Sequence, residues 1–167
     1  MIITAVIPEL AALERRMRDA PEMARQEMRT GMQGSVLVVE AAVADRAPVD
    51  TNRLRNAIAS RVDETGGGVS GFVEIANLDY AVYQEWGTGR HTDYPGAVAR
   101  DYEIVPRFRK ALAFTGADGA RVVRRKIKHP GVRPKRFFRD GWADAEPQVR
   151  RIFRRRLDAV TRYLAGR

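Results

Sequence analysis

The segment from Gly141 to Leu164 carries an apolar stripe at α-helical spacing, and this stripe constrains the fold more than any other feature. Its members recur at steps of three and four: Val149, Ile152, Phe153, Leu157, Val160 and Leu164. A helix with one apolar face is stable when that face is buried against another element. The sequence therefore predicts a C-terminal amphipathic helix over residues 141–165.

The N-terminal part of the chain also has the pattern of helices. Pro8 fits the first turn of a helix that reaches Met17. Asp19 is a suitable cap for a second helix, with Pro21 in its first turn, that continues to Arg46. A second apolar stripe follows at steps of three and four: Met28, Met32, Val36, Val39 and Val43. We therefore expect an N-terminal arm or helix over residues 1–20, followed by a long helix.

A short helix is predicted next, because Asp50 can cap a segment from Thr51 to Ser60. Val49 and Leu54 have the spacing of a hydrophobic staple. The glycines at positions 66–68 then interrupt the helical pattern.

Strand-like runs fill the middle of the chain. Residues 69–76 and 80–86 flank a turn at 77–79, which predicts a hairpin. Residues 102–105 and 107–114 are expected strands, and 120–128 pairs back across a turn at 116–119. The order of the elements predicts an α+β fold in which an antiparallel sheet of hairpins packs against a long N-terminal helix and a C-terminal amphipathic helix. We expect residues 1–167 to form a single domain.

Composition excludes several kinds of protein. The chain has no cysteine, which excludes disulfides, thiolate metal sites and cysteine nucleophiles. Its longest apolar run, Val36 to Val39, is far too short to cross a bilayer. The first residues lack the basic start of a signal peptide. We expect a soluble protein that is made and used in the cytoplasm and does not contact membrane.

Charge is distributed unevenly along the chain. Residues 1–100 carry 11 basic and 14 acidic side chains, whereas residues 101–167 carry 19 and 7, so the net charge changes from −3 to +12. Such asymmetry suggests an acidic partner surface or nucleic acid. Because the sequence has no zinc-finger, helix-turn-helix or RNA-binding motif, we favour a basic surface that faces neighbouring protein. A basic nucleic-acid-binding protein is the alternative.

The sequence contains no assembled catalytic or metal-binding set. The glycines at 66, 68 and 71 match a dinucleotide fingerprint in spacing, but the strand before and the helix after it are missing. His91 and Asp93 lack further ligands, His129 lies in a Pro/Gly loop, and Ser70 misses the nucleophile-elbow spacing. We therefore expect no enzyme, no cofactor and no metal. A small hydrolase would require an activity that depends on His91 or His129.

Three segments together resemble one family. Residues 47–58, APVDTNRLRNAI, are similar to the APVDTGxLRxSI stretch of phage minor tail-component proteins, also called neck or tail-completion proteins. Residues 80–89, YAVYQEWGTG, resemble that family's YAxYxExGTG, and residues 129–139, HPGVRPKRFFR, its HPGxxPxPFLRPA. Asn52 stands where glycine is usual, and Lys135-Arg136 replaces a proline-containing approach to the last helix.

The resemblance implies a family-like core over residues 47–139 in a head-tail connector domain. It implies a structural virion protein that forms a ring of six copies in the neck or tail, as a connector, tail-completion or tail-terminator subunit. The implied partners are other copies of the chain, a head-closure or adaptor protein, the tail-tube protein and double-stranded DNA in passage. Neither a catalytic residue nor a cofactor is implied.

Contact between copies needs two complementary faces on each subunit. The basic second half of one copy and the acidic first half of the next are candidates for these faces. Aromatic and basic residues between positions 83 and 137 are the candidate interface, with core packing as the alternative for the first two: Tyr83, Trp86, Arg90, Arg124, Arg125, Lys126, Arg136 and Phe137.

Overall fold

The chain folds into two compact units, which are described separately. The computed structural model describes residues 8–50, 52–65 and 68–166. Unit 1 comprises Met1–Asn77 and Phe138–Arg167, and unit 2 comprises Leu78–Phe137. Residues 1–7 of the expected N-terminal arm, Thr51 and two of the three central glycines lie outside the described residues.

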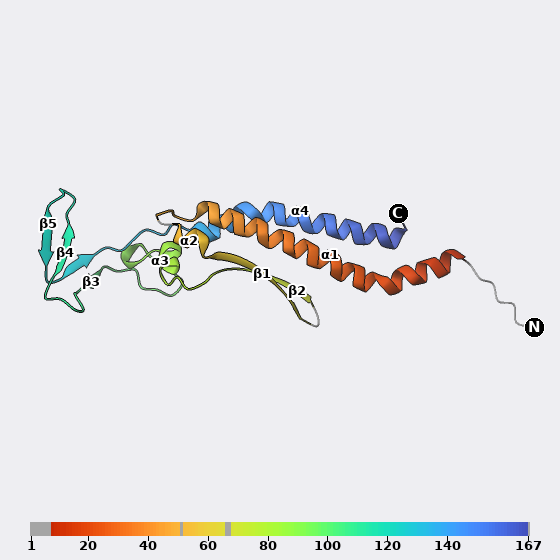
Figure 1. Cartoon of the computed structure of the whole chain (residues 1–167), viewed down its shortest axis with the longest axis horizontal. Helices are drawn as coiled ribbons and strands as arrows, with labels where there is room; N and C mark the ends of the chain where they lie inside the picture. Colours follow the sequence, from red (N-terminus) through yellow and green to blue (C-terminus); the bar gives the residue numbers. More distant parts are fainter. Residues whose placement is uncertain (1–7, 51, 66–67, 167) are drawn as a thin grey trace, which may run out of the picture. The chain divides into compact units, whose positions relative to one another are not determined.

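Unit 1 is built on two long helices (Figure 1). Helix α1 spans Pro8–Arg46, and helix α4 spans Phe137–Ala165. The sequence predicted α4 correctly but placed its start four residues too late. The predicted break at Asp19 is wrong, because α1 continues through Pro21. A proline inside a helix removes one backbone hydrogen bond, which a helix of this length tolerates when its apolar face is packed.

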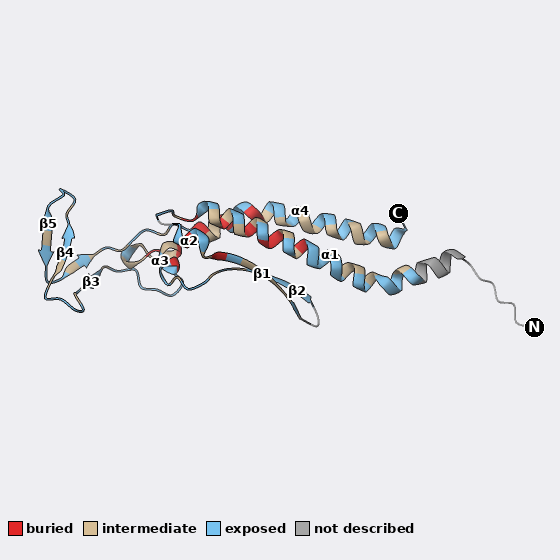
Figure 2. Cartoon of the chain, viewed as in Figure 1, coloured by how far each residue is buried: buried red, intermediate tan, exposed pale blue. Residues whose placement is uncertain are grey.

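The α1–α4 pair buries the apolar stripe of α1 in its C-terminal half. Val36, Val39 and Val43 are buried, and Gly141 of α4 lies against the backbone of α1 at Val43. Figure 2 shows the buried residues of unit 1 gathered along this part of α1. The core of unit 1 is therefore built from small β-branched side chains that allow the helices a close approach.

A hairpin of two strands covers another side of α1. Strand β1, Ile58–Thr65, pairs antiparallel with β2, Gly68–Ile75, and both strands contact α1. Gly71 lies against Val36, whose Cγ1 would be 2.5 Å from a Cβ at that position. This close approach fixes the hairpin against the helix.

The short helix and first hairpin differ from the sequence prediction. Helix α2 is only Arg53–Asn56, and β1 begins at Ile58, so residues 58–60 are strand and not helix. Alternating burial from Ile58 onward shows a period of two, which outweighs the i, i+4 spacing with Leu54. Asn52 has φ 58°, the left-handed geometry that glycine or asparagine accepts.

Unit 2 contains one helix and two small sheets. Helix α3, Tyr80–Trp86, replaces the strand predicted there, so the predicted 69–76 with 80–86 hairpin is wrong. Ala81 and Glu85 are both buried and lie one helical turn apart, as on one face of a helix. The sequence prediction missed this spacing because it relied on the alternation of apolar residues, which is typical of a strand. A 3₁₀ turn, η1, follows at Gly89–His91.

The two sheets of unit 2 each have two strands. Strand β3, Tyr102–Ile104, pairs with β6, Ile127–His129, and β4, Leu112–Thr115, pairs with β5, Arg121–Arg124. The predicted turn at 116–119 and the pairing of strands across it are confirmed, although β4 begins five residues later than expected. The single strand predicted over 120–128 is wrong, because the chain forms two strands there, and β6 pairs with β3. The α+β class is confirmed, with three separate two-stranded sheets in place of one continuous sheet.

Candidate functional site

Two segments of unit 2 that lie about 45 residues apart in sequence are bound together by backbone hydrogen bonds. The amide of Thr88 donates to the carbonyl of Val132 at 2.8 Å, and the amide of Arg90 donates to that of Pro130 at 2.8 Å. The Thr88 hydroxyl accepts from the Val132 amide at 2.9 Å. We call residues 84–90 and 130–136 the loop clasp. They belong to two of the segments that carry the family resemblance.

Glycines make the close approach within the loop clasp feasible. Gly87 has φ 71°, and a Cβ there would lie 2.7 Å from the carbonyl oxygen of Val132. Gly131 has φ 98°, and a Cβ there would overlap the carbonyl of Thr88. Both positions combine left-handed geometry with a backbone neighbour, so only glycine fits.

Side chains fasten the loop that follows the first clasp segment. Arg136, with φ 53°, donates to the Asp93 carboxylate at 3.0 Å. The Asp93 amide donates to the carbonyl of Trp86 at 3.0 Å, and the Trp86 ring meets Tyr94 edge-on with centroids 5.4 Å apart. The loop that follows Arg90 is therefore held at several points.

A carboxylate next to the clasp is shared by two cations. Asp101 accepts from Arg90 Nε at 2.5 Å and from Arg90 Nη2 at 2.7 Å, and Lys128 Nζ lies 3.6 Å away. The hydrogen bonds from Arg90 are the main cause that lowers the pKa of Asp101 below 3.8. The Asp101 side chain is 17% exposed, so solvent screens this pair less than most in the chain.

The ion pair between Asp101 and Arg90 makes the stability of unit 2 depend on pH. Because the folded-state pKa of Asp101 lies below its unfolded value, its contribution is complete above about pH 4 and is lost as pH falls through the folded pKa. We expect faster amide hydrogen exchange at Arg90 near pH 3, after correction for intrinsic rates. In the Asp101→Asn variant, the amide of Arg90 should exchange faster at pH 6, and its exchange rate should depend less on pH. An exchange profile equal to that of the unchanged chain would contradict the role of Asp101.

Apolar side chains surround a groove of about 410 Å³ on unit 2. Its lining includes Val82 and Tyr83 of α3, Tyr94 and Val98, together with the clasp residues Gly87 to Gly89. The exposed fractions are 57% for Tyr83 and 76% for Val98. We call Val82, Tyr83, Tyr94 and Val98 the groove patch. Exposed apolar residues grouped around a concave surface are typical of protein contact sites.

The predicted interface residues differ in their surroundings. Tyr83 lies in the groove patch and Trp86 is half-buried behind it. Arg90, Lys126 and Arg136 form ion pairs with Asp101, Glu103 and Asp93, and Arg124 and Arg125 are exposed. Phe137 is only 1% exposed, so it packs inside its own chain and we correct its assignment as a contact residue. Val82, Tyr94 and Val98 were missed, because the sequence did not show that they surround one groove.

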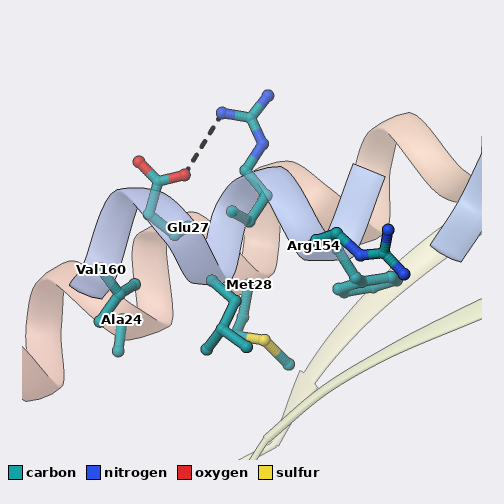
Figure 3. Close-up of a pocket in the computed structure, with 8 residues that line it drawn as sticks. Ala24, Glu27, Met28, Arg154 and Val160 are labelled. Atoms are coloured by element: carbon teal, nitrogen blue, oxygen red, sulfur yellow. Dashed lines mark hydrogen bonds and ion pairs between the residues drawn. The ribbon is translucent and has the colours of Figure 1, made fainter. Parts of the chain in front are cut away.

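Unit 1 has an apolar groove of about 380 Å³ between α1 and α4 (Figure 3). Ala24, Met28 and Val160 line it, and Glu27 accepts from Arg156 Nη1 at 3.3 Å beside it. The groove lies between the two helices, where their seam is not covered by another layer of the described chain. Its other lining residues include Phe153, Arg154 and Leu157.

Neither histidine is placed for catalysis. His129 Nδ1 accepts from the Gly131 amide at 2.9 Å, and its ring lies 5.5 Å from Tyr102, so it supports the loop clasp. His91 lies half-buried in the 3₁₀ turn. The described residues contain no group of three metal-ligating side chains. Among them, every helix is too short or too polar to cross a membrane.

The family is identified by its sequence model. Residues 11–87 match the family described as "Bacteriophage HK97-gp10, putative tail-component". Over these residues, which make up somewhat less than half of the chain, the chain is similar to this family of structural phage tail components, which is not a family of enzymes. The match includes α1, the first hairpin and α3, whereas the second clasp segment lies outside it. No curated protein and no solved structure matches the chain.

The matched region therefore resembles a phage tail component, a structural protein of the virion that has other tail proteins as partners. Helix α3 and the start of the loop clasp fall inside the matched region, so the groove patch is partly built by residues of the family segment.

Proposed function

We propose that the chain is a subunit of a closed ring of six copies at the junction of head and tail, as a neck, tail-completion or tail-terminator protein. DNA passes through the ring, and its two faces meet a head-closure or adaptor protein and the tail-tube protein. In this proposal residues 1–167 act as one connector domain. The observation that carries it is the exposed groove patch, which lies on a frame fixed by the loop clasp in a tail-component chain.

The groove patch suits one side of a heterologous contact. Aromatic anchors in a pocket contribute most of the energy of many protein interfaces. Tyr83 and Tyr94 are exposed by about half and flank a concave surface. Because the loop clasp orders this surface before binding, contact requires little further ordering of the backbone. Arg90 and Arg136 form ion pairs at the loop clasp, which lines the groove through Gly87 to Gly89.

The sequence-based idea that acidic and basic halves dock on each other needs revision. The basic helix α4 pairs with α1 inside unit 1, for example through Arg156 and Glu27. Arg46 of α1 likewise pairs with Asp140 and Asp144 of α4. These contacts engage Glu27 of the first half and Asp140 and Asp144 of the second half within the same copy. We therefore propose that the apolar groove patch, more than charge, provides the contact between copies.

Val98→Asp tests this contact. An aspartate in the groove patch should raise the dissociation constant of self-association about tenfold or more, because it places an unpaired charge in an apolar interface. Val49→Asp is the matched control, since Val49 is also exposed, at 58%, but lies in unit 1. Sedimentation velocity over a range of concentrations measures both. Equal association of the two variants would contradict the role of the groove patch.

In the phage, absence of the protein should leave unjoined heads and tails. Electron microscopy of a lysate from a strain that lacks the gene shows this directly. Complete particles in normal numbers would contradict a role at the head-tail junction.

A further inference from the structure

The β4–β5 hairpin brings two separate basic runs to one end. Arg107, Arg109 and Lys110 come just before β4, and Arg124 and Arg125 are found where β5 ends. In the register of the hairpin Leu112 lies opposite Arg124, so the start of β4 and the end of β5 are adjacent. We call these five cations the basic base of the hairpin.

The basic base is not neutralised by the described part of the chain. The nearest acidic residues in sequence are already engaged, Asp101 with Arg90 and Lys128, and Glu103 with Lys126. Asp118 lies at the turn, at the opposite end of the hairpin, where it accepts from the Ala120 amide at 3.1 Å. All five cations are exposed and none forms an ion pair with a described residue.

The hairpin does not serve to bury a core. None of its strand residues is buried, and Val123 and Phe114 remain 54% and 40% exposed (Figure 2). Phe108, between two arginines of the basic base, is 96% exposed. A two-stranded hairpin with two open faces gains little stability from its own contacts. The clustered arginines that it carries therefore point to an external polyanion.

Another copy of the chain is a poor source of that polyanion. Many carboxylates of unit 1 lie in ion pairs within the unit: Glu22, Glu27, Asp63, Glu64, Glu74, Asp140, Asp144 and Glu146. Arginine holds phosphate oxygens in bidentate geometry, and a phosphate occurs about every 1.7 Å along duplex DNA. Duplex DNA therefore fits the basic base better than a second copy does.

We propose that the basic base of the β4–β5 hairpin binds the phosphate backbone of double-stranded DNA without reading its sequence. This replaces our sequence-based expectation that these arginines face neighbouring protein. The inference rests on the proposed ring only for where the DNA comes from, because binding is measured without the ring. A two-stranded ribbon also has the width of the major groove, so the hairpin can lie along a duplex.

Two variants of equal charge separate this site from general basicity. The base variant is Arg107→Gln, Arg109→Gln, Arg124→Gln and Arg125→Gln. The control variant changes four exposed arginines of α4: Arg151→Gln, Arg154→Gln, Arg155→Gln and Arg162→Gln. Two of them, Arg155 and Arg162, line one shallow hollow together with Asp158, which weakens the field there. Binding of the full chain to a fluorescent 30-base-pair duplex of arbitrary sequence is measured by anisotropy between 50 and 200 mM salt.

We expect the base variant to bind the duplex about tenfold more weakly or worse at 100 mM salt, and the control variant to stay within about threefold of the unchanged chain. The slope of log affinity against log salt should fall by about 2 to 4 in the base variant, since each lost phosphate contact removes about 0.9. Equal losses in both variants, or no binding by the unchanged chain at 50 mM salt, would overturn the proposal.

Sedimentation velocity of the same variants distinguishes a failure of the DNA proposal from a failure of the proposed ring. The base variant should self-associate as the unchanged chain does. If it instead lost self-association and kept its affinity for the duplex, the basic base would meet protein and the DNA proposal would be wrong. Failure of the unchanged chain to self-associate would contradict the ring and leave the DNA measurement valid.

Discussion

Gly131→Ala is expected to open the loop clasp and to destabilise unit 2 on the order of 3 kcal/mol or more. A methyl group at this position overlaps the carbonyl of Thr88, and φ 98° is itself unfavourable for alanine. The clash falls on backbone atoms, which cannot rotate away as a flexible side chain can. Urea unfolding measures the loss, and amide hydrogen exchange at Thr88 and Arg90 locates it.

Gly96→Ala is the matched control for this substitution. Gly96 has φ 79° and open space around the position of a Cβ, so alanine there costs only the strain of left-handed geometry, about 1 kcal/mol. Similar losses in the two variants would mean that the approach of Thr88 to Gly131 contributes nothing. Because the clasp frames the groove patch, Gly131→Ala should also weaken self-association, whereas Gly96→Ala should not.

Gly141→Ala is expected to destabilise unit 1 by about 2 kcal/mol, through separation of α1 and α4. A Cβ at Gly141 would lie 2.7 Å from Cα of Val43 and 3.0 Å from the carbonyl oxygen of Ala42. The higher helix propensity of alanine offsets at most about 1 kcal/mol of this overpacking. Calorimetry should show a lower unfolding temperature.

Gly34→Ala, in the facing helix α1, is expected to stabilise unit 1. The nearest atom to its Cβ would be Cδ1 of Ile152 at 3.9 Å, an ordinary contact. We expect the free energy of unfolding of this variant to rise by about 0.5–1 kcal/mol, because glycine is unfavourable in a helix interior. The two glycine substitutions should therefore change the unfolding temperature in opposite directions. A higher unfolding temperature in both variants would contradict the close approach of the helices at Gly141.

Local patterns predicted the two long helices of unit 1 well. The stripe that contains Val36 and Val43 repeats at helical spacing, and so does that of α4, and each is a property of a short segment. The break predicted at Asp19 followed from a capping residue and a proline. It was wrong because the length and packing of α1 outweigh local propensity, a tertiary effect that sequence patterns do not reveal.

Strand partners were harder to predict than strands. The sequence indicated a strand over 69–76 but paired it with 80–86, where the chain forms α3. Both segments contain alternating apolar residues, and seven residues fit either a strand or two turns of helix. The glycines at 66–68 were recognised as a break in the helical pattern, but the strand before them was not. The β4–β5 hairpin was predicted because its turn residues lie next to its strands.

The candidate site was predicted only in part. Tyr83 and Trp86 were identified from their aromatic character, and both lie at or behind the groove patch. The loop clasp joins segments 45 residues apart through backbone atoms, which carry no sequence signal of their own. Its one trace in the sequence was the set of glycines around Thr88 and at Gly131. Glycines at such spacing in two loops are consistent with backbones in contact, but do not identify the partner.

The most direct test of the account is the mass of the particle that the full chain forms when it is mixed with the tail-tube and head-closure proteins of its own phage. Native mass spectrometry resolves the number of copies. The account predicts one closed species of six copies, which is lost in Val98→Asp and kept in Val49→Asp. A chain that stays monomeric at micromolar concentration with these partners present would contradict the claim that copies of this tail component bind one another.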